Sequence, residues 1–429
     1  MLRSLLPRMI FGLVLTAGLA ACNASRKSSA LPSPLSRTAA ANTQASDPAA
    51  MRIDTMLADS WAAYRQRFIQ QDGRIIDREA TDRSTSEGQA YALLRAVFAD
   101  SPESFDRVLQ WSENNLKRQN AANQPLDQLW AWQWGRTASG TWGTLDQNFA
   151  TDADIDAATA LILASRRWQK PDYLTIAKAK LKDIWDKATV TIVPPSATSR
   201  KIDPQRYLLP GPLKAFQRDG TIRFNPSYLA PYAFRLFAQV DPDRDWLSLV
   251  DSSYHLLEHS TQTSAVGLPS DWIAFNPKTG KYSPVNEPEP LISRYGFDAT
   301  RVWWRVALDA TWFQEPRAIA FLESHLKHLK TLWISHQNVP AQLDLKGRPL
   351  VEYEATSQYG MLYAAFRVTD PAIAQEIFER KLLPQYHDGF WDNDSAYYTQ
   401  NLAWFGLMPH RIIVPYLSQP TQALQNTTP

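Results

Sequence analysis

The chain has 429 residues, of which 44% are hydrophobic and 21% are charged, and its formal net charge is +2 at pH 7. This length is enough to bury a large core, in one large domain or two smaller ones. A net charge so close to zero gives no support for nucleic-acid binding through bulk electrostatics. The 16 Trp, 16 Tyr and 17 Phe residues indicate either aromatic core packing or a cleft that stacks on flat ligands.

The first 22 residues have the pattern of a secretion signal. Arg3 and Arg8 form a positive n-region, and the apolar run over residues 9–21 is too short to span a membrane comfortably. The run ends in Leu-Ala-Ala-Cys, which resembles the lipobox of bacterial lipoproteins, in which the cysteine (here Cys22) is lipidated. We therefore expect an exported protein that is periplasmic, envelope-anchored through Cys22, or secreted; a simple cleaved signal is the alternative.

The residues that follow the signal predict a tether and then one folded domain. Residues 23–50 are rich in Ala, Ser, Pro and Thr and contain almost no large apolar residues, so they cannot offset their ordering entropy and should be flexible. The composition of residues 417–429 is similar and predicts a disordered tail. The folded domain is expected over residues 51–416. Because Cys22 is the only cysteine, no intramolecular disulfide is possible.

Within the predicted domain the apolar periodicity is nearly all helical. No repeat shows as sequence identity, but about a dozen helices with generous connections suit six helical hairpins. The predicted class is therefore all-α. The predicted helices span residues 51–68, 86–99, 102–116, 151–168, 171–187, 231–237, 241–259, 302–313, 316–332, 359–366, 372–381 and 397–405.

A tryptophan-rich stretch interrupts the helical pattern at residues 128–143. Trp130, Trp132 and Trp134 alternate along the chain, and Trp142 follows after a loop that bears a glycine. Alternating Trp predicts a short strand with one buried face. It equally predicts a platform for sugars, because aromatic faces stack on the apolar faces of pyranose rings. The residues alone leave both interpretations open.

Three aspartates at alternate positions, Asp152, Asp154 and Asp156, open the apolar helical pattern of residues 150–168. Thr151 or Asp152 is a suitable N-cap, and negative charge is favoured at a helix N-terminus. Asp152 and Asp156 are four residues apart, so their charges repel on one side of the first turn. Either one aspartate caps the helix and two are solvated, or another requirement keeps the cluster. An EF-hand calcium loop fits poorly, because Ala157 stands in place of its glycine and Leu163 in place of its closing Glu.

Three acids, Glu87, Asp152 and Asp298, each lie at the start of a predicted helix just after a loop. Each alone is explained by the helix dipole. If the helices stack as a ring, these starts converge on one face, and carboxylates in an aromatic cleft point to glycoside hydrolysis. The seven His form no HExxH motif, and no P-loop, G-x-G-x-x-G or G-x-S-x-G motif is present. No metal or cofactor is expected.

Three segments around these acids resemble the motifs of glycoside hydrolase family 8. They are Thr85–Tyr91 (TSEGQAY), Ala150–Trp168 (ATDADIDAATALILASRRW) and Gly296–Arg301 (GFDATR). Four further segments match in order, so the resemblance covers the whole predicted domain: WSENNL at 111–116, AWQWG at 131–135, NPSY at 225–228 and YTQNL at 398–402. AWQWG and the run before the aspartates look most like the endoglucanases of bacterial cellulose-synthase systems. Gly296-Phe297 replaces the family's Tyr before Asp298, which removes a hydroxyl near that acid.

The resemblance implies an (α/α)6 barrel and an inverting mechanism. It implies that Glu87 is the proton donor, that Asp298 is the general base, and that Asp152 binds the distorted sugar. Arg301, three residues after Asp298, is expected to keep that acid ionised, with a surface salt bridge as the alternative. The subsite candidates are Trp132, Trp134, Asn225 and Tyr228.

The expected function is that of an endo-β-1,4-glucanase acting on cellulose-like chains and linked to bacterial cellulose production. The expected partner is the β-1,4-glucan, with membrane contact only through Cys22; association with cellulose-synthase machinery and a monomeric state are further expectations. A chitosanase, a mixed-linkage glucanase, a xylan-active enzyme of the same family and a non-catalytic polysaccharide-binding lipoprotein are the alternatives. A chitosanase would need additional acids in its subsites, and the positions of Asp271 and Glu354 cannot be derived from the sequence.

Overall fold

The computed structural model describes residues 48–193, 204–286 and 291–418. The first helix, α1 (Pro48–Phe68), begins just before the predicted domain boundary at residue 51. The predicted signal, the lipidation candidate Cys22 and nearly all of the predicted tether lie outside the described residues. So does the predicted tail after residue 418. None of the helices in the described ranges is both long and apolar enough to cross a bilayer.

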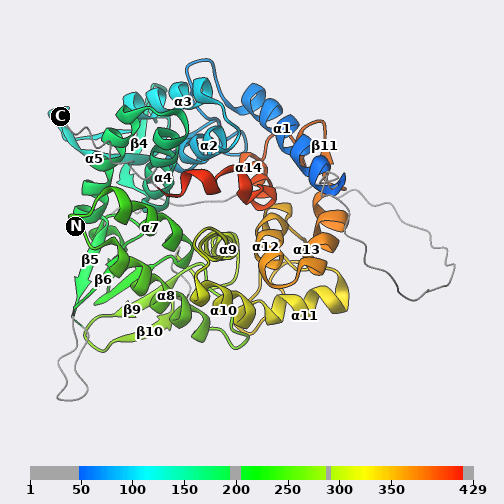
Figure 1. The fold of residues 1–429 in the computed structure, drawn as a ribbon. Helices are drawn as coiled ribbons and strands as arrows, with labels where there is room; N and C mark the ends of the chain where they lie inside the picture. Colours follow the sequence, from blue (N-terminus) through cyan, green and yellow to red (C-terminus); the bar gives the residue numbers. More distant parts are fainter. Residues whose placement is uncertain (1–47, 194–203, 287–290, 419–429) are drawn as a thin grey trace, which may run out of the picture.

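Helices arranged in two concentric layers make up most of the described chain (Figure 1). Each inner helix packs against the next, and the last contacts the first, so the inner layer closes into a ring. Its members are α2 (Ser86–Phe98), α4 (Thr151–Trp168), α7 (Pro231–Val240), α9 (Arg301–Phe313), α12 (Thr356–Thr369) and α14 (Tyr397–Leu407). Inner helices are covered on nearly every side, which is why α4 is buried from Thr151 to Ala164.

The outer layer pairs one helix with each inner helix. These outer helices are α1, α3 (Pro102–Asn115), α5 (Pro171–Lys187), α8 (Trp246–Gln262), α10 (Pro316–His325) and α13 (Pro371–Ile377). The helix α1 packs on α14, and the indole Nε1 of Trp404 donates to the Leu57 carbonyl at 3.0 Å, so the first and last helices close the barrel. The predicted (α/α)6 barrel of six helical hairpins is confirmed.

The described chain also contains short helical segments outside the twelve helices of the barrel. The two α-helices are α6 (Leu213–Phe216) and α11 (Lys327–His336), and a π-helical stretch, η2 (Phe378–Leu382), follows α13. Three 3-10 turns are η1 (Pro226–Tyr228), η3 (His410–Ile412) and η4 (Val414–Tyr416).

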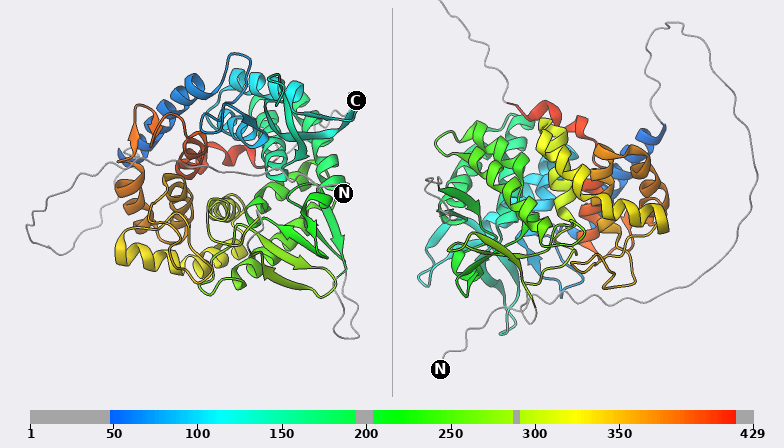
Figure 2. Two further views of the ribbon diagram at one scale, coloured as in Figure 1. Left: turned by 180° about the vertical axis from the view of Figure 1, so that it is seen from behind. Right: turned by 90° about the horizontal axis from the view of Figure 1, so that it is seen from below.

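Small antiparallel sheets lie at one end of the ring (Figure 2, right). Apart from the strand considered for the tryptophan-rich stretch, the nearly all-helical prediction did not include them. One sheet has the order β1-β3-β2 with β4 paired to β3: β1 (Ser84–Thr85), β2 (Lys117–Gln119), β3 (Pro125–Arg136) and β4 (Trp142–Phe149). A second has the order β10-β9-β8-β7: β7 (Gln217–Arg218), β8 (Thr221–Phe224), β9 (Ile273–Asn276) and β10 (Lys281–Pro284). Two-stranded ribbons pair β5 (Thr189–Ile192) with β6 (Gln205–Leu208) and β11 (Tyr386–His387) with β12 (Phe390–Trp391).

The sheets help to position the site because two of their strands lead along the chain into inner helices. Strand β1 runs directly into α2, and β4 ends just before α4. Consecutive inner helices point the same way, since an outer helix returns the chain between them. Their N-termini therefore lie at the same end of the barrel, together with the sheets, and the loops at that end carry the polar residues considered next.

Candidate active site

The three predicted acids meet at the end of the barrel where the inner helices begin. Glu87 lies in the first turn of α2 and Asp152 in the first turn of α4. Asp298 lies in the turn that leads into α9. The Thr85 side chain caps α2, because it accepts from the Gly88 amide at 3.0 Å. The backbone at Ala150 starts α4, with no side-chain cap.

One buried guanidinium joins the three carboxyl groups. Arg301 Nη1 donates to Glu87 Oε2 at 2.8 Å and to Asp152 Oδ2 at 2.9 Å. Its Nη2 donates to Asp298 Oδ1 at 2.6 Å. The alternative of a surface salt bridge is wrong, since the Arg301 side chain is only 2% exposed. The Arg301 guanidinium thus binds three carboxyl groups, and the mutual repulsion of these acids favours protonation of one of them.

The three carboxyl groups differ in their environments. Glu87 and Asp152 are 21% and 3% exposed, whereas Asp298 is 33% exposed and is the most accessible to water. Burial raises the pKa of Glu87 to about 7; Arg301 opposes this shift and the charge of Asp152 adds to it. Burial also raises the pKa of Asp152, against the attraction of Arg301. A carboxyl with a raised pKa beside an accessible carboxylate is the pairing that acid–base hydrolysis requires.

The other two aspartates of α4 also have cationic partners, so the interpretation of one capping and two solvated aspartates is wrong. Asp154 Oδ1 accepts from Lys180 Nζ at 2.8 Å, with both side chains 1% exposed. Asp156 Oδ2 accepts from Arg305 Nη2 at 2.8 Å. Each carboxylate points in a different direction around the helix and pairs there with a buried cation, and these pairs fix α4 against α5 and α9.

A pocket opens over the acids. Of the predicted subsite residues, Trp132 and Tyr228 line it, and Trp134 and Asn225 do not. The sequence interpretation did not include Trp272 or Tyr397, which also line the pocket. The complete lining is Arg83, Thr85, Ser86, Glu87, Trp132, Ala150, Asp152, Tyr228, Trp272, Asp298, Arg301 and Tyr397.

Trp134 and Asn225 have structural partners instead. Trp134 stacks on Trp142 at a centroid distance of 5.3 Å, meets Trp111 edge-on at 5.2 Å and lies under the Arg74 guanidinium. Asn225 caps the 3-10 turn η1, where its Oδ1 accepts from the amide of Ser227 at 3.0 Å. The strand interpretation of the tryptophan-rich stretch is confirmed, and Trp132 of this strand lines the pocket.

Tyr397 is the most informative residue that the sequence interpretation missed. Its hydroxyl donates to Glu87 Oε1 at 3.0 Å and lies 3.3 Å from Thr85 Oγ1. This hydrogen bond stabilises the ionised form of Glu87 and so opposes the rise in its pKa. The available signal was the position of Tyr397 immediately before the YTQNL segment, at the start of the last inner helix.

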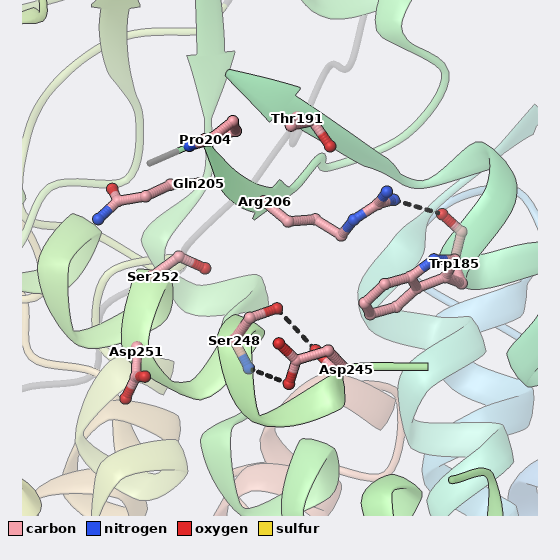
Figure 3. A pocket seen from close by; sticks show the side chains of 9 residues that line it. All are labelled: Trp185, Thr191, Pro204, Gln205, Arg206, Asp245, Ser248, Asp251 and Ser252. Carbon is pink, nitrogen blue, oxygen red and sulfur yellow. Dashed lines mark hydrogen bonds between the residues drawn. The ribbon is translucent and has the colours of Figure 1, made fainter. Parts of the chain in front are cut away.

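A second hollow lies on the outside of the barrel, between α5, β5–β6 and α8 (Figure 3). It contains none of the predicted site residues. Its single large aromatic, Trp185, is covered by the Arg206 guanidinium at 4.3 Å and meets the Trp246 ring at 5.1 Å. In the three described ranges no group of His, Cys, Asp or Glu is arranged to hold a metal ion.

Comparisons with known proteins agree with this geometry. The model of glycosyl hydrolases family 8 matches residues 35–411. The endoglucanase of Escherichia coli K12 is 34% identical over 250 residues, which are 58% of this chain and 62% of that protein, so the match spans about three fifths of the relative. The endoglucanase of Salmonella typhi is 31% identical over 359 residues, 82% of this chain and 88% of that protein.

Among solved structures, the endo-β-1,4-glucanase CMCax of Acetobacter xylinum superimposes with a TM-score of 0.63 at 25% identity. The superposition covers 84% of this chain and 99% of that one. The ring of helices, the acids at the starts of its inner helices and the match over residues 35–411 lead to one assignment: the chain belongs to glycosyl hydrolases family 8.

Proposed function

We propose that the protein is an endo-β-1,4-glucanase that hydrolyses cellulose-like chains with inversion. The observation that carries the proposal is the convergence of Glu87, Asp152 and Asp298 on Arg301 beneath a pocket lined by aromatic rings. The relatives named above bear the name endoglucanase, which supports a β-1,4-glucan as the substrate class.

In the proposed mechanism Glu87 is the general acid. Its pKa of about 7 keeps it protonated under mildly acidic conditions, so that it can protonate the glycosidic oxygen. Asp298 is the general base that takes a proton from the attacking water: it is the most exposed of the three acids, and Arg301 Nη2 donates to its Oδ1 and holds the carboxyl group at the pocket. In inversion that water attacks the face of the sugar opposite the leaving group.

In the proposed mechanism Asp152 binds the sugar whose glycosidic bond is cleaved. It is buried, it remains hydrogen-bonded to Arg301, and it shares the pocket lining with the acid and the base. A carboxylate held there stabilises the positive charge that develops on the sugar ring. Trp132, Trp272 and Tyr228 supply the flat apolar surfaces on which pyranose rings stack.

We also propose where the protein works. The signal-like segment and Cys22 support an exported protein anchored at the bacterial envelope by a lipid, with periplasmic and secreted forms as alternatives. The resemblance of AWQWG and the run before the aspartates to endoglucanases of bacterial cellulose-synthase systems supports a link to cellulose production. Metabolic labelling with a radioactive fatty acid tests the anchor: wild type should incorporate label, and Cys22→Ser should not.

The function is tested by hydrolysis of soluble carboxymethylcellulose, with chitosan, mixed-linkage glucan and xylan in parallel. An endoglucanase causes fast viscosity loss, confined to the β-glucans, and ¹H NMR should show the α-anomer first. Glu87→Gln should lower kcat by at least about 10²-fold while oligosaccharide binding survives. Glu103→Gln, at an exposed first-turn acid of the outer helix α3, is the matched control and should leave kcat unchanged.

Each contrary result points to a different alternative. Activity only on chitosan or xylan would overturn the substrate and keep the acids. Glucan binding without hydrolysis by the wild type would favour the polysaccharide-binding lipoprotein. A Glu87→Gln variant with wild-type kcat would show that the acid is assigned to the wrong residue.

A further inference from the structure

Asp271 lies against the turn that presents Asp298 to the pocket. It follows α8 in the chain, only 5% of its surface is exposed, and it is absent from the pocket lining. A buried carboxyl group outside the pocket, directly beneath the turn of the proposed base, is not explained by substrate contact.

Two hydrogen bonds attach Asp271 to the two ends of this turn. The Asp271 amide donates to the Arg294 carbonyl at 2.7 Å, and the Ala299 amide donates to Asp271 Oδ1 at 2.8 Å. Ala299 is the residue immediately after Asp298. The carboxyl therefore fixes the backbone on the C-terminal side of the base, while the Asp271 main chain fixes the start of the turn.

The middle of the turn is shaped to fit the same carboxyl group. A Cβ atom placed on Gly296 would lie 2.5 Å from Asp271 Oδ2, and the three closest atoms to it all belong to the Asp271 carboxyl. Residue 296 is therefore glycine because the turn passes directly over this side chain. In the sequence alone, Gly296-Phe297 is visible only as a departure from the family motif.

Asp271 lies between a cation, Arg294, and an anion, Asp298, whose effects on its pKa are opposite. Arg294 Nε lies 3.3 Å from Asp271 Oδ2, and Asp298 adds a negative charge across the turn. Tyr295 and Tyr398 are the other titratable groups that interact with it. Burial raises the pKa of Asp271, and the charge of Asp298 raises it further. Keeping a buried carboxyl group beside a second negative charge costs folding stability. Its presence at position 271 therefore indicates a role in the site.

We propose that Asp271 is a positioning residue for the general base: its carboxyl holds the turn of residues 294–299 so that Asp298 faces the attacking water. This inference rests on the proposed function. A base displaced by about 1 Å loses about 10²-fold in rate, because proton transfer depends on the alignment of base and water. Since Asp271 does not line the pocket, its removal should leave substrate binding nearly intact.

The test compares kcat and KM on carboxymethylcellulose oligomers for folded protein. Asp271→Ala should lower kcat by about 30- to 100-fold and change KM by less than about twofold. Asp271→Asn should recover most of the loss, to within about tenfold of wild type, because the amide oxygen still accepts from Ala299. Asp309→Asn, at an equally buried carboxylate of α9 that pairs with Arg235, is the matched control: it should lower the melting temperature and leave kcat unchanged.

Gly296→Ala supplies a second measurement, which can be made in the wild type even if the Asp271→Ala variant folds poorly. In the wild type the added methyl must displace the carboxyl, so kcat should fall by about tenfold. In the Asp271→Ala background the obstructing oxygens are absent, and the same substitution should have little further effect. Additive losses, or an Asp271→Ala enzyme with wild-type kcat, would overturn the inference. A wild type without activity on any β-glucan would instead overturn the proposed function.

Discussion

Replacing Arg301 with Met should destabilise the protein in a manner that depends on pH. The substitution keeps an apolar stem of similar length and removes the one cation bound to Glu87, Asp152 and Asp298 at 2.6–2.9 Å. Breaking a buried pair by removing one partner costs about 3–5 kcal/mol, because the remaining charges lose their compensation. We expect a loss of this size at pH 7.5.

The pH dependence follows from the direction of the pKa shifts. Arg301 lowers the pKa of Glu87 and of Asp152, so its removal raises both further above their unfolded values. A carboxyl whose folded pKa is raised contributes stability that is complete below its unfolded pKa and is lost as pH rises through its folded pKa. At pH 4.5 the two carboxyls can stay protonated, and the loss should shrink to about 1–2 kcal/mol.

Denaturant unfolding of wild type and Arg301→Met at pH 4.5 and pH 7.5 measures both quantities. Arg411→Met removes an exposed ion pair with Asp54 and should cost less than about 1 kcal/mol at either pH, which controls for the loss of an arginine as such. If Arg301→Met is equally destabilised at the two pH values, the carboxyl groups are not the source of the loss and the reasoning is refuted.

Four other substitutions should give distinct results. Tyr397→Phe removes the hydroxyl that stabilises ionised Glu87, so the alkaline limb of kcat/KM, expected near pH 7, should move to higher pH by less than about one unit. Trp132→Ala should raise KM by about tenfold through loss of stacking, whereas Trp134→Ala should lower the melting temperature and leave KM nearly unchanged. Lys180→Met leaves its buried carboxylate partner uncompensated and should cost about 3–5 kcal/mol in denaturant unfolding.

The opposite result for each variant would contradict the role given to that residue. A fixed alkaline limb in Tyr397→Phe would mean that another group titrates there. A large KM effect in Trp134→Ala would place that ring against the substrate. A Lys180→Met protein as stable as wild type would mean that the partner carboxyl accommodates the loss by protonation at little cost.

The sequence predicted the helical ring and the three acids because both leave local signals. Apolar periodicity marks the helices, and the motifs around Glu87, Asp152 and Asp298 are contiguous. The spacing of three residues predicted the contact of Arg301 with Asp298. The contacts of Arg301 with Glu87 and Asp152 leave no local signal, because Arg301 is 149 residues from Asp152 and only the closed ring brings the two together. The roles of Trp132 and Trp134 were not separable either, since register shifts in β3 at residues 131–134 break the two-residue alternation that assigns faces.

The closure of α14 on α1 has a consequence for how the activity arises during synthesis. Glu87, the proposed proton donor, is hydrogen-bonded to Tyr397, and the helix that carries Tyr397 also supplies the final contact of the ring. A nascent chain therefore contains its acids long before it contains a working pocket. Chains released early, before residue 397, should have no hydrolytic activity at all, which makes the enzyme latent until its last helix has been made.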